Sequence, residues 1–302
     1  MTHDYRFDRR LTLDDILNRD VLWATLRLTA PLLFAAMGGL ISERAGVVNI
    51  ALEGLMLIGA FSAAAGGIWT GDPFAGLAIG IAAAMLGATI HAIWCITFQG
   101  DQIVAGTAIN LLGLGIPTFL TQRIWSQAGG TPSVDRLPAF GPLNILVYLA
   151  FLIVPIVHVT LFRTKPGLRI LASGEHPRAA ESVGIDVGRY RYACVIASGA
   201  LAGLGGALLS IGDLGSFSAN MTQGRGFIAL AAVIFGNWMP IPTMGATLLF
   251  GFAQNLGIQA QVKDWPVSRD LILALPYLLT LVAIAGFVRR SAPPAGLGRH
   301  AN

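Results

Sequence analysis

A short polar stretch interrupts the apolar run of residues 21–69. It reads SERAGVVNIALEG, from residue 42 to residue 54, and carries charged side chains together with Asn49 and Glu53. These two residues are four positions apart, so on a helix they would share one face, where they could hydrogen-bond a sugar hydroxyl or the edge of a base. Polar groups at membrane depth are costly unless they pack against protein or line a water-filled cavity. The stretch therefore predicts part of a transport pathway.

Glu53 also has a structural interpretation. An unpaired carboxylate inside a membrane is expensive, so Glu53 would then form an ion pair with Arg44 or Arg27, or cap a short helix. The sequence leaves the solute-binding interpretation and the structural interpretation open.

Two further places carry polar side chains within apolar sequence. Asn110 lies in an apolar run that follows the polar residues 99–107, where it faces either the pathway or its protein neighbours. Asn237 and Trp238 offer an amide and an aromatic plane. The two prolines that follow them cannot continue a regular helix, so we expect a turn and a second break there. Stacking on an aromatic ring holds a nucleobase with about 1–3 kcal/mol, although a tryptophan at a membrane interface also serves as an anchor.

The remaining residues with reactive side chains are expected to serve packing and not catalysis. His91 and His158 lie in apolar sequence without neighbouring ligands, and Cys95 and Cys194 form no metal-binding pattern. No nucleophile–base pair is recognisable, so neither an enzyme nor a metal site is expected. The net charge of +4 comes from basic residues in loops that flank membrane spans. Such residues set topology, and they do not indicate a nucleic-acid partner.

The composition places these residues in a membrane. The chain is 54% hydrophobic and 12% charged, against roughly 25% charged residues in soluble domains. It predicts an all-α, polytopic transmembrane helix bundle of about 8 to 10 membrane segments, including broken or re-entrant half-helices. Residues 225–238 are apolar but too short to cross a bilayer, so we expect a half-helix there. Longer spans are predicted at residues 22–41, 46–69, 74–97, 103–122, 144–162, 192–212, 241–260 and 271–288.

Basic residues predict which loops are cytoplasmic. Lys and Arg gather before residue 21, within 163–191 and after residue 287, and they are sparse in the other loops. By the positive-inside rule, both termini and the loop 163–191 are cytoplasmic. The chain then divides into an N-terminal cytoplasmic or interfacial segment (1–21), a transmembrane domain (22–288) that contains the loop, and a cytoplasmic tail (289–302).

This topology conflicts with the number of apolar segments. A cytoplasmic N-terminus and an outward loop after residue 123 require an odd number of crossings, but four apolar segments precede that loop. One of them must be broken or re-entrant. The candidates are residues 42–53 and the polar residues after Gln99.

The loop 163–191 is the most informative polar segment. Gly174 and Pro177 divide it, and its apolar residues recur among charges, so we expect two short helices that meet at a turn. An amphipathic helix of this kind either offers a docking surface to a partner or lies against the bundle itself.

Three runs of the sequence resemble one family of transport proteins. They are LTAPLLFAAMGGLISERAGVVNIALEGLMLIGAF, SGEHPRAAESVGIDVGRYRYACVIASGALAGLGGALLS and GRGFIALAAVIFGNWMPIPTMGATLLFGFAQ. All are similar to integral-membrane permease subunits of bacterial ABC importers, in the group that includes ribose, other simple-sugar and branched-chain amino acid permeases. ISERAGVVNIALEG and ALAAVIFGNWMP resemble most the nucleoside-importing branch. The resemblance covers residues 22–288.

The resemblance implies a multi-pass permease of the bacterial inner membrane, surrounded by lipid, that imports nucleosides or a related ribose-containing solute. It implies three partners: an ATP-binding subunit, a second homologous permease in a heterodimer, and an extracytoplasmic substrate-binding protein. The chain has no GxxxxGK[ST] phosphate loop, so the partner would hydrolyse ATP and this chain would bind no cofactor. The segment that would couple to the ATPase contains Gly174, Glu175, His176, Pro177, Ala179, Ala180 and Gly184.

Other functions remain as alternatives at this point. A simple-sugar permease would have the same architecture. An ion-coupled secondary transporter would use Glu53, Glu43 or His91 as its ion site and would need no ATPase. A membrane scaffold or receptor subunit is the third alternative, and the two polar breaks argue against it.

Overall fold

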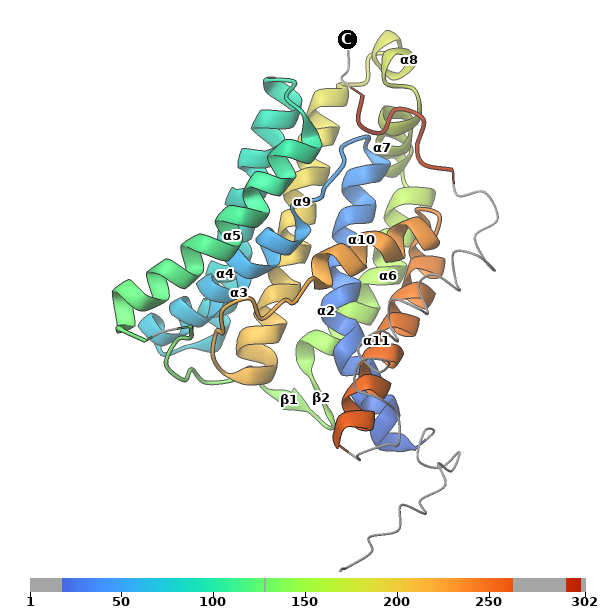
Figure 1. Cartoon of the computed structure of the whole chain (residues 1–302). Coiled ribbons are helices and arrows are strands. Elements are labelled where there is room, and N and C mark those ends of the chain that lie inside the picture. Colours follow the sequence, from blue (N-terminus) through green and yellow to red (C-terminus); the bar gives the residue numbers. More distant parts are fainter. Residues whose placement is uncertain (1–17, 128, 263–291, 300–302) are drawn as a thin grey trace, which may run out of the picture.

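The structure is a bundle of long helices with one small β-hairpin at one end (Figure 1). It is a computed structural model and describes residues 18–127, 129–262 and 292–299. The predicted span 271–288 and most of the predicted segment 1–21 lie outside the described residues. In chain order the elements are α2 (Arg19–Arg44), α3 (Leu52–Thr70), α4 (Pro73–Ala92), η1 (Ile93–Thr97), α5 (Gln102–Trp125), β1 (Ala139–Phe140), β2 (Leu143–Asn144), α6 (Ile145–Arg163), α7 (Lys165–Glu175), α8 (Pro177–Ser182), α9 (Val187–Ala207), η2 (Leu208–Leu214), α10 (Arg225–Phe235) and α11 (Pro240–Val262).

Six helices among the described residues are long and apolar enough to cross a membrane. They are α2, α3, α4 with the π-helical η1, α5, α6, and α9 with the π-helical η2, and they coincide with the first six predicted spans. The 23-residue α11 covers the predicted span 241–260, and the 11-residue α10 is the predicted half-helix. The prediction of an all-α polytopic bundle with broken segments is confirmed.

Polar side chains define where several of these helices begin. Asn18, Asp72, Asp101, Asn144 and Asp186 each accept a hydrogen bond from a backbone N–H in the first turn of α2, α4, α5, α6 and α9. The first turn of a helix lacks intrahelical partners for these N–H groups, and the side chain supplies one. The polar residues between the apolar runs therefore start the spans.

Glycines allow α3, α4 and α9 to pack backbone against backbone. A Cβ atom at Gly59 would lie 2.6 Å from the Cα of Gly203, and one at Gly80 would lie 2.7 Å from the carbonyl oxygen of Gly59. Gly76 and Gly206 approach the backbone of α3 in the same way. Small residues at such spacing are typical of tightly packed membrane helices, and these glycines let α3, α4 and α9 approach closely.

The bundle has two ends. The α7/α8 face holds α7, α8 and residues 292–299, and the hairpin face holds β1, β2 and the loop before them (Figure 1). At the α7/α8 face, Arg44 Nη1 lies 3.6 Å from Glu175 Oε1. Towards the hairpin face, Arg27 Nη2 lies 3.5 Å from the carbonyl oxygen of Pro142. Helix α2 therefore runs from the hairpin face to the α7/α8 face.

The direction of α2 corrects the predicted topology. Counting basic residues placed the start of the first span on the same side as the loop 163–191, but the start of α2 and helix α7 lie at opposite ends of the bundle (Figure 1). The end of α5 also lies at the hairpin face, where the rings of Trp69 and Trp125 stack with centroids 6.2 Å apart. The start of α2 and the loop after residue 123 therefore lie on the same side of the bundle. Four crossings connect them, and an odd number is not required.

The first break lies at one of the two predicted places. Helix α2 ends at Arg44, residues 45–51 are not helical, and α3 begins at Leu52. Gly46 has a φ of 95°, a backbone conformation that residues with a Cβ atom rarely adopt. The residues after Gln99 form only the turn between η1 and α5.

The second break follows the half-helix α10. Asn237 and Trp238 have φ values of 50° and 53°, which ends the helix. Helix α11 then begins at Pro240. A proline is tolerated at this position, because a backbone N–H in the first turn of a helix would have no intrahelical acceptor. The predicted turn at these prolines is confirmed.

Candidate functional site

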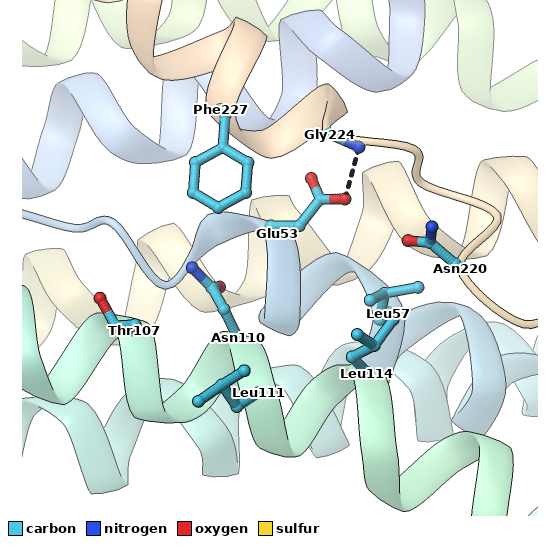
Figure 2. A pocket seen from close by; sticks show the side chains of 9 residues that line it. All are labelled: Glu53, Leu57, Thr107, Asn110, Leu111, Leu114, Asn220, Gly224 and Phe227. Carbon is cyan, nitrogen blue, oxygen red and sulfur yellow. Dashed lines mark hydrogen bonds between the residues drawn. The ribbon is translucent and has the colours of Figure 1, made fainter.

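The starts of α3 and α10 face each other in the middle of the bundle, and Glu53 joins them. Glu53 Oε1 accepts hydrogen bonds from Thr222 Oγ1 at 2.5 Å and from Gly224 N at 2.7 Å. Glu53 Oε2 accepts one from Gly226 N at 2.6 Å. The carboxylate thus caps the N-terminus of α10, where the helix dipole favours negative charge. Figure 2 shows Glu53 reaching towards Gly224.

Two glycines make this contact possible. Gly224 occupies the position before α10 with a φ of 81°, and no side chain of its own caps the helix. At Gly226, a Cβ atom would collide with the backbone of Glu53. The sequence Gly-Arg-Gly therefore allows a carboxylate from another helix to replace the usual cap.

The structural interpretation of Glu53 as a cap has direct support in this geometry. The ion pair with Arg44 or Arg27 that the sequence also allowed is wrong, because Arg44 pairs with Glu175 and Arg27 approaches the backbone of Pro142.

Side chains from α5 satisfy the backbone of the first break. Asn110 Nδ2 donates to the carbonyl oxygen of Ile50 at 2.9 Å, and its Oδ1 accepts from Gly54 N at 2.8 Å. Gln102 Oε1 accepts from Val48 N at 2.7 Å. Non-helical backbone is tolerated at membrane depth only when its polar groups find such partners. Asn110 therefore holds the first break against α5.

A cavity of about 440 Å³ lies beside this junction. Figure 2 shows its lining side chains from α3, α5, α10 and the loop before α10. The volume falls within the range of roughly 300–1,000 Å³ that is usual for small-molecule sites. Among the predicted pathway residues, Glu53 and Asn110 are brought together here. The full lining is Glu53, Leu57, Thr107, Asn110, Leu111, Leu114, Asn220, Gly224 and Phe227.

The cavity is not closed on the side between α5 and α10. The side chains of Leu111 and Phe227, which line it, are 67% and 49% exposed. Only 28% of the most apolar stretch of α5 is buried within the chain. Among the described residues, this side of the cavity is therefore open.

Asn49 lies outside the cavity, which corrects the predicted shared face with Glu53. Asn49 belongs to the non-helical stretch 45–51, so the four-residue spacing of a helix does not relate it to Glu53. Its side chain is fully buried, and Nδ2 donates to Ser198 Oγ of α9 at 2.7 Å. Asn49 therefore holds the break against α9.

Asn237 and Trp238 also lie apart from the cavity, at the α7/α8 face. The indole of Trp238 is 5% exposed, and its Nε1 donates to the carboxylate of Glu43. The carbonyl oxygen of Trp238 accepts from Arg44 Nε at 2.7 Å. The predicted stacking plane for a nucleobase is therefore wrong for Trp238, because its ring is buried between protein groups.

Seven of the nine lining residues were not identified from the sequence, and three of them, Thr107, Asn220 and Phe227, bear on the chemistry of the site. Thr107 lies one helical turn before Asn110, so its position on the same face could have been inferred from the helical period. Asn220 and Phe227 flank the start of α10, and no local pattern connects them to α5. Only the fold brings these three to one place.

The groups weighed as ion sites have protein partners. Glu53 caps α10 as described, and Glu43 accepts from Trp238. His91 is fully buried, and its Nε2 lies 3.2 Å from the carbonyl oxygen of Val48, which fits the expected packing histidine.

The predicted coupling segment forms two short helices, α7 and α8, with His176 between them. Of its residues, His176, Ala179 and Gly184 are exposed, and Glu175 and Pro177 are partly buried. Gly174 and Ala180 are buried within the chain. These two residues therefore pack against the chain itself, and the exposed ones remain accessible to a partner.

Comparison with known proteins agrees with this architecture. Residues 21–284 match the family described as "Branched-chain amino acid transport system / permease component". The guanosine ABC transporter permease protein NupQ of Bacillus subtilis is 39% identical over 91% of this chain and 94% of its own. The nucleoside ABC transporter permease protein NupC of Lactococcus lactis is 34% identical over 89% and 92%. The putative glucose ABC transporter permease protein TsgC13 of Haloferax volcanii is 39% identical over 84% and 82%.

The family match covers the helices described above, from the third residue of α2 to the end of α11. It also includes both breaks and every residue that lines the cavity. The chain belongs to the family of permease components of the branched-chain amino acid transport system.

Proposed function

We propose that the chain is the membrane-spanning permease subunit of an ATP-driven importer in the bacterial inner membrane. Its solute is a nucleoside or a related ribose-containing compound. The observation that carries this proposal is the cavity around Asn110, which lies in mid-bundle where the two interrupted helices meet. Two of the similar proteins are named for guanosine or nucleoside transport.

The chemistry of the cavity suits such a solute. Thr107 and Asn220 add a hydroxyl and an amide to the lining, and Leu111 and Phe227 add apolar surface. A nucleoside combines flat apolar base faces with polar edges and sugar hydroxyls, so it needs both kinds of contact. Glu53 shapes the site chiefly by fixing α10, since its two oxygens already accept three hydrogen bonds.

We propose that a second permease closes the cavity on its open side. The open side of the cavity lies between exposed faces of α5 and α10, and a related permease packed there would enclose the solute. We propose a heterodimer, as the family resemblance implies. An extracytoplasmic binding protein would deliver the solute at the hairpin face and account for most of the affinity.

A partner ATPase would act at the α7/α8 face, which we propose is cytoplasmic. The sequence has no phosphate-binding loop of its own. The exposed side of α8 offers the partner a contact that leads into the bundle through Glu175 and Arg44. Arg44 also binds the backbone of Trp238, so movement of α7 reaches both breaks and could alternate access to the cavity.

Uptake by reconstituted vesicles tests this function. We expect accumulation of radiolabelled guanosine in vesicles that contain this chain with its ATPase, second permease and binding protein, and only with ATP on the ATPase side. Unlabelled nucleosides should compete, whereas ribose and glucose should not. Competition by glucose alone would favour the sugar alternative, and uptake by this chain alone under an ion gradient would contradict the ABC mechanism.

Substitution on α8 tests the coupling surface. Ala179 is exposed and Ala180 is 4% exposed. We expect Ala179→Glu to lower ATP-driven uptake by at least about tenfold, because a charge would be buried at the partner contact, without changing the melting temperature of the isolated chain. Ala179→Ser is the matched control and should retain uptake. Wild-type uptake with Ala179→Glu would exclude α8 as the coupling element, whereas Ala180→Glu should reduce folding itself.

A further inference from the structure

Residues 292–299 are an integrated part of the α7/α8 face. The segment reads APPAGLGR, and its two prolines have no N–H group. Each of its other six backbone N–H groups has an acceptor. Two of these bonds close a turn within the segment, from Leu297 N to the carbonyl oxygen of Pro294 and from Arg299 N to that of Gly296. The other four bonds leave the segment.

These four hydrogen bonds reach three functional places. Two go to the end of α7: Ala295 N donates to Glu175 Oε2 at 3.1 Å and Gly296 N to the carbonyl oxygen of Gly174 at 2.8 Å. One goes to the first break, from Gly298 N to Gly46 O at 3.1 Å. One goes to the second break, from Ala292 N to Asn237 Oδ1 at 3.0 Å.

Backbone packs closely against backbone at this contact. A Cβ atom at Gly296 would lie 2.7 Å from the carbonyl oxygen of Gly174, and one at Gly174 would collide with the carbonyl oxygen of Arg44 and lie 3.2 Å from Gly46 N. The backbones of the first break, α7 and the segment therefore lie in three touching layers. Leu297 adds an apolar contact with the main core.

Arg191 of α9 binds the first break and the segment 292–299 from the side. Its guanidinium group is buried, with the residue 3% exposed. Nη1 donates to the carbonyl oxygen of Arg299 at 2.9 Å, and Nε donates to that of Ala45 at 3.2 Å. One buried cation thus binds both the segment and the first break.

We propose that residues 292–299 form a latch that makes the coupling segment and the two breaks move as one unit. A displacement of α7 is transmitted through Gly174 to Gly296, and from there through Gly298 to Gly46. The first break leads directly into Glu53 and the cavity. This proposal rests on the proposed ATP-driven transport for its consequence, but the mechanical link itself can be measured without any solute.

Truncation provides the first test. A chain that ends at residue 291 lacks the latch, and a chain that ends at residue 299 keeps it as the matched control. In the assembled complex, we expect hydrogen exchange in residues 45–51 to become about tenfold faster in the shorter chain, with exchange in α5 unchanged. Unchanged exchange in residues 45–51 would overturn the latch.

Coupling provides the second measurement on the same complexes. We expect guanosine taken up per ATP hydrolysed to fall about fivefold or more when the latch is removed, while the rate of ATP hydrolysis persists. An unchanged ratio would overturn the proposal. If the wild-type complex takes up no nucleoside, the proposed function fails, and the exchange measurement still decides whether the latch exists.

A point substitution covers the case in which the shorter chain does not assemble. Gly296→Val places a side chain against the backbone of Gly174, whereas Ala292→Val places the same side chain at an exposed position. We expect faster exchange in residues 45–51 and poorer coupling only in Gly296→Val. Equal behaviour of the two variants would overturn the latch.

Discussion

Glu53→Ala is expected to abolish ATP-driven uptake and to lower the melting temperature of the isolated chain. The substitution removes the acceptor of three hydrogen bonds at the start of α10, from Thr222 Oγ1, Gly224 N and Gly226 N. A buried donor left without a partner costs about 1–3 kcal/mol, so the free energy of unfolding should fall by about 3 kcal/mol or more. Loss of the negative charge at the helix N-terminus adds to this.

Thr222→Val is the matched control for Glu53→Ala. It removes one of the three donors and leaves no backbone N–H unpaired, so it should cost only about 1 kcal/mol. Thermal unfolding in detergent and vesicle uptake should be measured on both variants. If Glu53→Ala lost uptake but kept the wild-type melting temperature, the capping role would be wrong and direct contact with the solute would be favoured.

Gly113→Val should prevent the chain from reaching its folded state in normal yield. A Cβ atom at Gly113 would lie 2.5 Å from the Cα and 2.6 Å from the carbonyl oxygen of Gly54. Both neighbours are backbone atoms, so α5 must move away from α3, which breaks the bond between Asn110 Oδ1 and Gly54 N. Overpacking of this kind costs about 1–3 kcal/mol or more.

Gly115→Val offers a control on the same helix. Two residues correspond to about 200° around a helix, and nothing lies within 4 Å of a Cβ atom at Gly115. The helix propensity of valine is the same in both variants, so only the contact with α3 differs. The yield and melting temperature of the isolated chain are the measurements, and equal values for both variants would contradict the close approach at Gly54.

Local pattern was sufficient to predict the interrupted helices. Polar residues within apolar sequence indicated a break either at residues 42–53 or after Gln99, and the prolines after Trp238 indicated the second. Both signals act over a few residues, because a glycine or a proline changes the backbone at its own position. The helical character and the short α10 followed from the lengths of the apolar runs in the same way.

The partners of the polar side chains could not be predicted from pattern. Asn110 and Ile50 are 60 positions apart, and Glu53 and Gly226 are 173 positions apart. Periodicity assigned Asn49 to the face of Glu53, but the helix starts only at Leu52. The backbone at Asn49 turns its side chain to α9 instead.

By itself, the sequence determined that this is a helical membrane protein of the permease family with two breaks in its spans. Only the tertiary structure decided the direction of α2, the burial of Ala180, the capping role of Glu53 and the contact of residues 292–299 with Gly46 and Gly174. The physical reason is the distance along the chain over which each interaction acts. Apolar length and backbone conformation are local properties, whereas a hydrogen bond between distant segments depends on how every helix packs between them.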